Sequence, residues 1–169
     1  MLSIRAISKA KFVECDGNAI PGDSDGEPCE HDTTVRSFPL GREGLKVGCY
    51  VVSKGSREFS FEIGYSHYAR WFDELYRMLY GVDADGLCTK YRRHRGKPFI
   101  EFVDVPSLSQ GDTIGPKTST KLHGDFVAYA RTARKYFTQG EDLAWMWDVY
   151  REFRKALKIA SDGGFVCYW

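Results

Sequence analysis

The segment best equipped for chemistry is the glycine-rich stretch of residues 111–121, which leads into an expected helix. Proline is favoured at a first helical position, where its missing N–H has no partner to lose, and Pro116 fits that position. Free backbone N–H groups and the helix macrodipole favour an anion there. The residues that would hold it are Thr113, Gly115, Lys117, Thr118 and Lys121. The sequence therefore predicts a docking point for a phosphate or carboxylate.

A purely structural interpretation of the same segment stays open beside the first. Asp112 or Thr113 would cap the turn, and the two lysines would be solvated. The segment also lacks the Gly-x-x-x-x-Gly-Lys-Ser/Thr spacing of a P-loop. Nucleotide hydrolysis of the P-loop type therefore has no support in the sequence.

A second polar cluster lies where an expected strand becomes a helix. Its members are Tyr65, Ser66, His67 and Arg70. Ser66 and His67 are a nucleophile and a base by type, but adjacent helical residues do not face each other, and the sequence nominates no orienting acid. Ser66 would otherwise cap the helix, and the aromatic rings would stack on a planar ligand whose phosphate Arg70 holds. We include these residues in the predicted ligand site.

A basic run between residues 90 and 97 is the best polyanion patch that the sequence offers. Its cations include Lys90, Arg92, Arg93 and Arg95. A basic run that also contains aromatic residues can bind a nucleic-acid backbone. The alternative is an ordinary solvated loop.

An enzyme acting on a nucleotide or phosphoester is the rival to a binding function. His67 or His123 would be its general base, with Asp112 or Asp125 as partner. Asp125 follows Lys121 by four residues, however, and that spacing favours an ion pair on a helix surface.

Metal sites have little support. Cys15, Cys29 and His31 lack the paired short spacing of zinc ligands. The acidic residues of 16–32 lack the bidentate acid that completes a calcium loop. We predict no metal and no cofactor, and we expect 16–32 to be a solvated Gly/Pro-rich loop.

Bulk composition limits the classes of protein that remain. A chain of 169 residues with 43% hydrophobic residues is long enough for one domain, which we place at 1–169. A net charge of +1 attracts neither nucleic acid nor an anionic membrane as a whole, so polyanion binding needs a local patch. The five cysteines form an odd set without short regular spacing, and no apolar run approaches the length that spans a bilayer. We expect reduced cysteines, a cytoplasmic location and no membrane partner.

The elements that must position these residues follow from apolar periodicity. Strands are expected within 3–13, 34–38, 47–52, 58–63, 98–105 and 165–169. Helices are expected at about 66–80, where Gly81 would end the first one, and at about 116–137 and 141–161. The runs 47–52 and 58–63 are expected to pair as a hairpin, and the last strand to join the same sheet. The predicted fold is α+β, a small mostly antiparallel sheet with about three helices packed on one face.

Three segments together resemble a family of small, largely uncharacterised proteins of bacteriophage and prophage genomes. They are Gly64–Trp71, Pro98–Phe126 and Tyr150–Val166, and the likeness extends over about residues 59–169. The family carries no established activity. The resemblance therefore implies an origin and a fold, and no reaction.

The sequence analysis thus favours binding over catalysis. We expect an accessory protein of a phage or mobile element that sequesters a small anionic ligand or occludes a host protein. The enzyme and a nucleic-acid-binding module stay open as alternatives, and so does a homo-oligomer.

Overall fold

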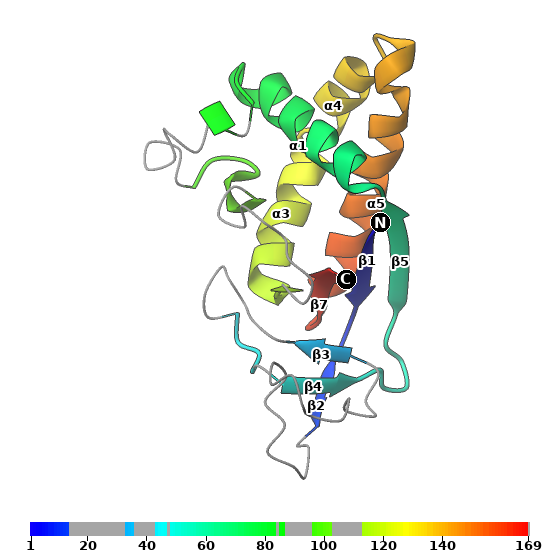
Figure 1. The fold of residues 1–169 in the computed structure, drawn as a ribbon. Coiled ribbons are helices and arrows are strands. Elements are labelled where there is room, and N and C mark those ends of the chain that lie inside the picture. The colour runs from blue at the N-terminus through cyan, green and yellow to red at the C-terminus, as the bar shows by residue number, and fades with distance from the viewer. Residues whose placement is uncertain are drawn as a thin grey trace.

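The computed structural model describes residues 1–13, 33–35, 43–46, 48–83, 85–86, 96–102 and 113–168. Within them, four strands form an antiparallel sheet in the order β5–β1–β7–β6 (Figure 1). Their bounds are β1 Leu2–Ile7, β5 Glu58–Ile63, β6 Thr113–Ile114 and β7 Phe165–Tyr168. The C-terminal strand joins the sheet, as predicted, and lies between β1 and β6.

Strand β7 is buried on both of its faces because successive side chains of a strand point to opposite sides. Val166 and Tyr168 lie in the main core on the helix side. Phe165 and Cys167 lie in a second apolar cluster on the other side, with Tyr50. The sheet therefore lies between two apolar cores, and β7 contributes side chains to both of them.

A second sheet of three described strands has the order β2–β4–β3. Their bounds are β2 Lys11–Val13, β3 Thr33–Val35 and β4 Gly48–Val51. The predicted hairpin of 47–52 with 58–63 is wrong, because β4 pairs with β2 and β3 whereas β5 pairs with β1. The turn between β4 and β5 instead carries the chain from one sheet to the other. Figure 1 shows the second sheet at the opposite end of the molecule from α1 (Tyr65–Tyr80).

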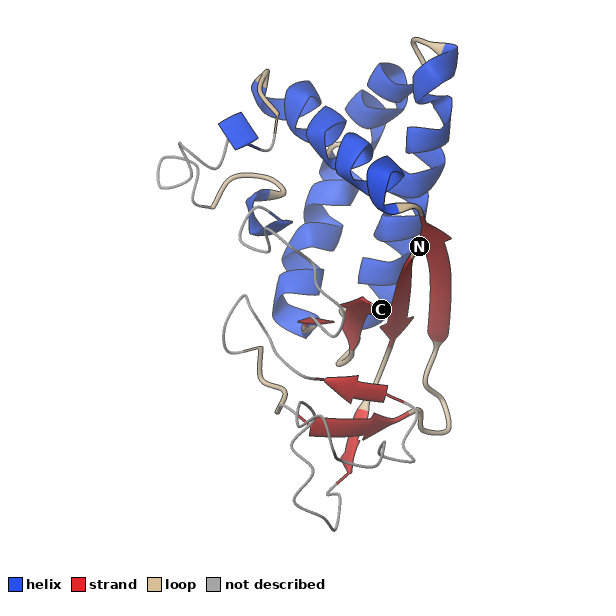
Figure 2. Cartoon of the chain, in the orientation of Figure 1, coloured by secondary structure: helices blue, strands red, loops and turns tan. Residues whose placement is uncertain are grey.

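The other α-helices of the described chain follow in its second half (Figure 2). They are α3 Pro116–Ala128, α4 Ala130–Phe137 and α5 Ala144–Ala160, the last preceded by a 3-10 turn, η3, at Glu141–Leu143. Gly81 ends α1 as predicted, with φ 70° and its N–H donating to the Arg77 carbonyl. The single helix expected over 116–137 is two helices, since Tyr129, with φ −97° and ψ 4°, departs from helical geometry between them.

Aromatic side chains fill the core between helices and sheet. Helix α5 lies against β1, β5 and β7, and α3 lies beside α5. The Trp71 ring of α1 stacks on Phe153 of α5, with centroids 4.7 Å apart and planes 10° apart. Trp71 also lies parallel to Phe126 of α3. The predicted α+β class is confirmed, with a mostly antiparallel sheet and helices packed over it.

The strand predicted at 98–105 is wrong over its described part. The chain forms a 3-10 turn, η2, at Ile100–Phe102, and Phe99 adopts φ 57°. Two tyrosines of α1 hold this segment, because the Tyr76 hydroxyl donates to the Phe99 carbonyl at 2.7 Å and the Tyr80 hydroxyl to the Pro98 carbonyl at 2.6 Å. The apolar residues therefore enter the core from a turn. Residues 103–105 lie outside the described residues.

Candidate functional site: a basic groove between α3 and α5

The start of α3 is occupied by a carboxylate of the same chain. Glu43 is only 4% exposed, and its Oε2 accepts the backbone N–H of Lys117 at 2.9 Å and that of Thr118 at 3.0 Å. Its Oε1 accepts the Thr118 hydroxyl. The helix start does hold an anion, as its chemistry predicts, but that anion is Glu43. The prediction that this turn binds an external anion is corrected accordingly, because Glu43 already accepts the hydrogen bonds of the donors that would bind it.

Gly115 is explained by the same carboxylate. A Cβ atom at Gly115 would overlap the Cβ of Glu43 and lie 2.5 Å from its Cγ. Thr113 is buried within β6, so it does not cap the helix; the cap position is Gly115. The glycine of this loop therefore makes room for a side chain that is distant in sequence.

Lys121 is also engaged inside the protein. Its Nζ lies 2.5 Å from the Glu101 carboxylate and 2.7 Å from that of Asp125, and it donates to the Lys97 carbonyl at 2.8 Å. Asp125 in turn accepts the backbone N–H of Phe99 at 2.9 Å. The ion pair predicted from the four-residue spacing is confirmed. The contacts of Lys121 hold the segment around η2 against α3. Lys121 was predicted to contact a ligand, and this prediction is corrected because its contacts are structural.

The predicted cluster at the start of α1 is exposed but does not meet the α3 residues. Tyr65 is 61% exposed, and Ser66 and Arg70 are exposed on the first turns. Ser66 does not cap the helix, since the cap position is Gly64. His67 packs edge-on against Trp145, with centroids 5.0 Å apart. Helix α1 follows β5 and α3 follows β6, which are opposite edges of the sheet, so the two halves of the predicted ligand site lie apart.

The catalytic pairs considered for an enzyme are not assembled in the described part of the chain. Neither His67 nor His123 makes a hydrogen bond or ion pair with a carboxylate there. Asp125 is held by Lys121 and Phe99 instead. Asp112 lies outside the described residues, as do the cations of the predicted nucleic-acid loop, Lys90, Arg92, Arg93 and Arg95.

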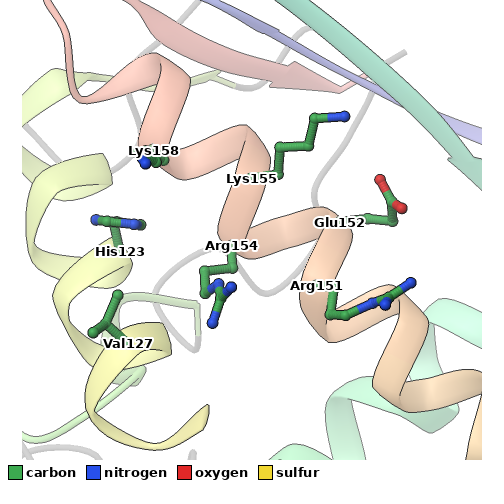
Figure 3. Close-up of a pocket in the computed structure, with 7 residues that line it drawn as sticks. All are labelled: His123, Val127, Arg151, Glu152, Arg154, Lys155 and Lys158. Carbon is green, nitrogen blue, oxygen red and sulfur yellow. The ribbon is translucent and has the colours of Figure 1, made fainter.

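A groove of about 610 Å³ lies on the outer surface where α3 and α5 run side by side (Figure 3). Its lining comprises His123 and Val127 from α3, and Arg151, Glu152, Arg154, Lys155 and Lys158 from α5. Four of these seven residues are cations and one is an acid. The four cations are spaced i, i+3, i+4 and i+7, which places them on one helical face. The groove is thus strongly basic in a chain whose net charge is only +1.

Helix α5 exposes this basic face to solvent because its opposite face is buried in the core. Phe153, Ala156 and Leu157 are fully buried and lie between the basic residues in sequence. An amphipathic helix over a sheet must turn the intervening positions outward. The same burial that anchors α5 therefore fixes where its cations point.

The chain matches no protein-family model, no curated protein and no solved structure.

Two groove cations lack an acidic partner among the described residues. Arg154 and Lys158 take part in no ion pair there, and both lie close enough to His123 to act on it electrostatically. Burial, and then the charges of Lys158 and Arg154, lower the pKa of His123 below its usual value of 6.5. His123 is consequently neutral at pH 7. Figure 3 shows His123 and Arg154 on facing sides of the gap between the two helices.

The remaining groove cations have contacts of their own. Arg151 pairs with Asp148 at 3.1 Å, at the surface, where such a pair is weak. The Lys155 ammonium lies 3.8 Å from the ring centroid of Phe59 on β5. The unpaired positive charge of the groove is therefore concentrated in Arg154 and Lys158, on the side that faces α3.

The sequence analysis missed this groove although its signal is present. Arg151, Arg154 and Lys158 recur at helical spacing in a segment expected to be helical, so they form a basic patch only once the helix is formed and not a continuous basic run in the sequence. The contribution of α3 had no such signal, because the packing of α3 against α5 joins residues about 30 positions apart.

In the part of the chain that the structure describes, no three His, Cys, Asp or Glu side chains gather into a group that could hold a metal ion. None of the helices in that part combines the length and apolar character needed to cross a bilayer. Cys49 and Cys167 are buried; Cys15, Cys29 and His31 lie outside the described residues.

Proposed function

We propose that the protein is a binding protein that holds an anionic partner in the groove between α3 and α5. The observation that carries this proposal is the unpaired positive charge of Arg154 and Lys158 beside a neutral His123. Like charges at close range repel each other, and an anion between them removes that cost. The favoured location of the anion is thus the groove between α3 and α5 and no longer the start of α3.

The shape of the groove supports a large partner. The lining side chains do not converge on one point, because Arg154 and Lys158 point toward α3 whereas Glu152 and Lys155 point away from it (Figure 3). Sites for small molecules are usually concave and bury most of the ligand. An extended anionic surface contacts more of these side chains at once than a single small ion does.

Binding is favoured over catalysis by the placement of the described histidines. A general base needs an acid or nucleophile within hydrogen-bond reach, and the described carboxylate nearest in sequence to His123, Asp125, serves Lys121. Together with the resemblance to phage and prophage proteins, this supports an accessory protein that acts by attachment to its partner.

Loss of the two unpaired cations is expected to weaken binding to heparin, used as a generic polyanion. The double variant Arg154→Ala, Lys158→Ala should elute from immobilised heparin at clearly lower salt than the wild type, since each lost contact reduces the number of displaced counterions. Elution salt under a linear gradient is the measurement. The matched control is Lys11→Ala, Lys54→Ala, which removes two exposed lysines on or next to the second sheet. If both variants elute together, or both with the wild type, the groove is not the binding site.

Heparin binding is also expected to strengthen as the pH falls from about 7 to about 5. The pKa of His123 in the free protein is lowered by burial and by Lys158 and Arg154, so an anion beside them raises it again. Binding then takes up a proton, and the affinity rises at lower pH. Elution salt should rise on acidification in the wild type and in His67→Gln, and rise less in His123→Gln. Equal pH profiles for the two histidine variants would contradict the assignment.

A further inference from the structure

The groove belongs to a longer stripe on α5 that includes an aromatic ring. Trp147, Arg151, Arg154 and Lys158 are separated by four, three and four residues, so they follow one face of the helix. Trp147 is half-buried, and its ring stacks on that of Tyr150 with centroids 5.4 Å apart and planes 17° apart. The ring is thus held in a fixed orientation by the core, and part of it reaches the surface.

The spacing of the cations matches a chain of phosphates. At 1.5 Å per residue, Arg151 and Lys158 are about 10.5 Å apart along the helix axis. That span corresponds to about three nucleotides if the strand keeps the 3.4 Å rise per nucleotide that each strand has in a duplex. Arginine also suits phosphate by its planar set of donors. A strand laid along α5 would therefore meet Arg151, Arg154 and Lys158 in turn.

The uncharged groups of the stripe distinguish a nucleic acid from an acidic protein. A carboxylate-rich protein surface has no need of an indole ring, whereas exposed bases stack on aromatic rings. Val127 adds apolar surface at 55% exposure on the facing helix. Bases of a duplex are already stacked on each other, so only an unpaired strand can use Trp147 in this way.

We infer that the stripe binds single-stranded nucleic acid, with phosphates on Arg151, Arg154 and Lys158 and one base stacked on Trp147. This inference rests on the proposed function and names its partner. It uses a surface different from the loop at 90–97 from which the sequence analysis derived a nucleic-acid module.

The test measures fluorescence anisotropy with a labelled single strand of about 12 nucleotides, a length within the range of known single-strand sites. Wild-type protein should bind this strand at least about ten-fold more tightly than a duplex of the same sequence. Trp147→Leu retains apolar packing and removes the stacking ring, so affinity for the strand should fall about ten-fold while the salt of heparin elution stays unchanged. Trp147→Phe, which keeps a ring, should lose clearly less. Thermal unfolding of each variant confirms that it is folded.

The salt dependence gives a second, independent readout. For Arg154→Ala, Lys158→Ala, the slope of log affinity against log salt should flatten by about 1.4, since each phosphate contact on a single strand contributes about 0.7. Lys11→Ala, Lys54→Ala should retain the full slope. Equal binding of strand and duplex, or a folded Trp147→Leu variant with unchanged strand affinity, overturns the inference. If heparin retention still depends on Arg154 and Lys158 in that case, the proposed function survives; if it does not, both fail.

Discussion

Replacing Gly164 by alanine should destabilise the protein by about 3 kcal/mol or more, which is at or above the upper end of the usual cost of overpacking that shifts the backbone. Gly164 is buried at the turn from α5 into β7, and its N–H donates to the Ala160 carbonyl at 2.9 Å. An added Cβ would overlap the carbonyl oxygen of Ile7 and lie 2.8 Å from the Cα of Ser8. Both are backbone atoms at the end of β1, so no rotation of a side chain can relieve the overlap.

The matched control is the same substitution at Gly124. This residue lies exposed in the interior of α3, and an added Cβ would meet nothing within 4 Å. Because alanine favours the helix over glycine by about 1 kcal/mol, Gly124→Ala should stabilise the protein slightly. Urea unfolding of both variants measures the difference. If the stability of the Gly164→Ala variant lies within about 1 kcal/mol of that of the wild type, the turn before β7 does not approach the end of β1 as closely as described.

The contrast between the two glycines shows what the sequence can and cannot reveal. Both follow positions that fit a helical pattern, and the pattern gives no sign that one is closed in by β1 while the other is open to solvent. Gly81 is different, because its role depends only on the helix that it ends. Local roles of this kind were predicted correctly, as were the alternation of β5 and the strand at the C-terminus.

Pairings between distant segments were the part that the sequence could not give. Strand β5 pairs with β1 rather than with the neighbouring β4, since β1 supplies apolar partners such as Ile4 opposite Phe61. The run that includes Phe99 has the composition of a strand, but the hydroxyls of Tyr76 and Tyr80 hold it as a turn. In both cases tertiary contacts outweigh local β-propensity.

The candidate site shows the same division. The sequence correctly indicated that the start of α3 attracts an anion, since that follows from the helix alone. It could not indicate that Glu43, more than 70 residues earlier, provides that anion. Nor could it show that α3 and α5 share an outer groove, which depends on packing across the core.

Replacing Glu43 by alanine should destabilise the protein by about 2–4 kcal/mol, as the loss of a helix cap that leaves partly buried donors unsatisfied. The amides of Lys117 and Thr118 and the Thr118 hydroxyl would all lose their acceptor. Glu43→Gln keeps an acceptor of the same length without its charge, so it should lose about half as much. Urea unfolding of the three proteins gives this ranking. Equal stability of Glu43→Ala and the wild type would show that the contact does not persist in solution.

The Glu43→Ala variant also offers a direct test of the chemistry of this helix start. Truncation leaves a space lined by free N–H groups where the carboxylate lay, so formate in solution should bind there and restore stability. With a dissociation constant of about 10 mM, formate at about 100 mM would return about 1.4 kcal/mol. Formate should not stabilise the wild type, in which Glu43 fills the site. Chloride at equal ionic strength should stabilise neither protein. A formate response in both proteins would mean that the anion acts elsewhere, while a response confined to the variant would show that α3 needs a negative charge at its start.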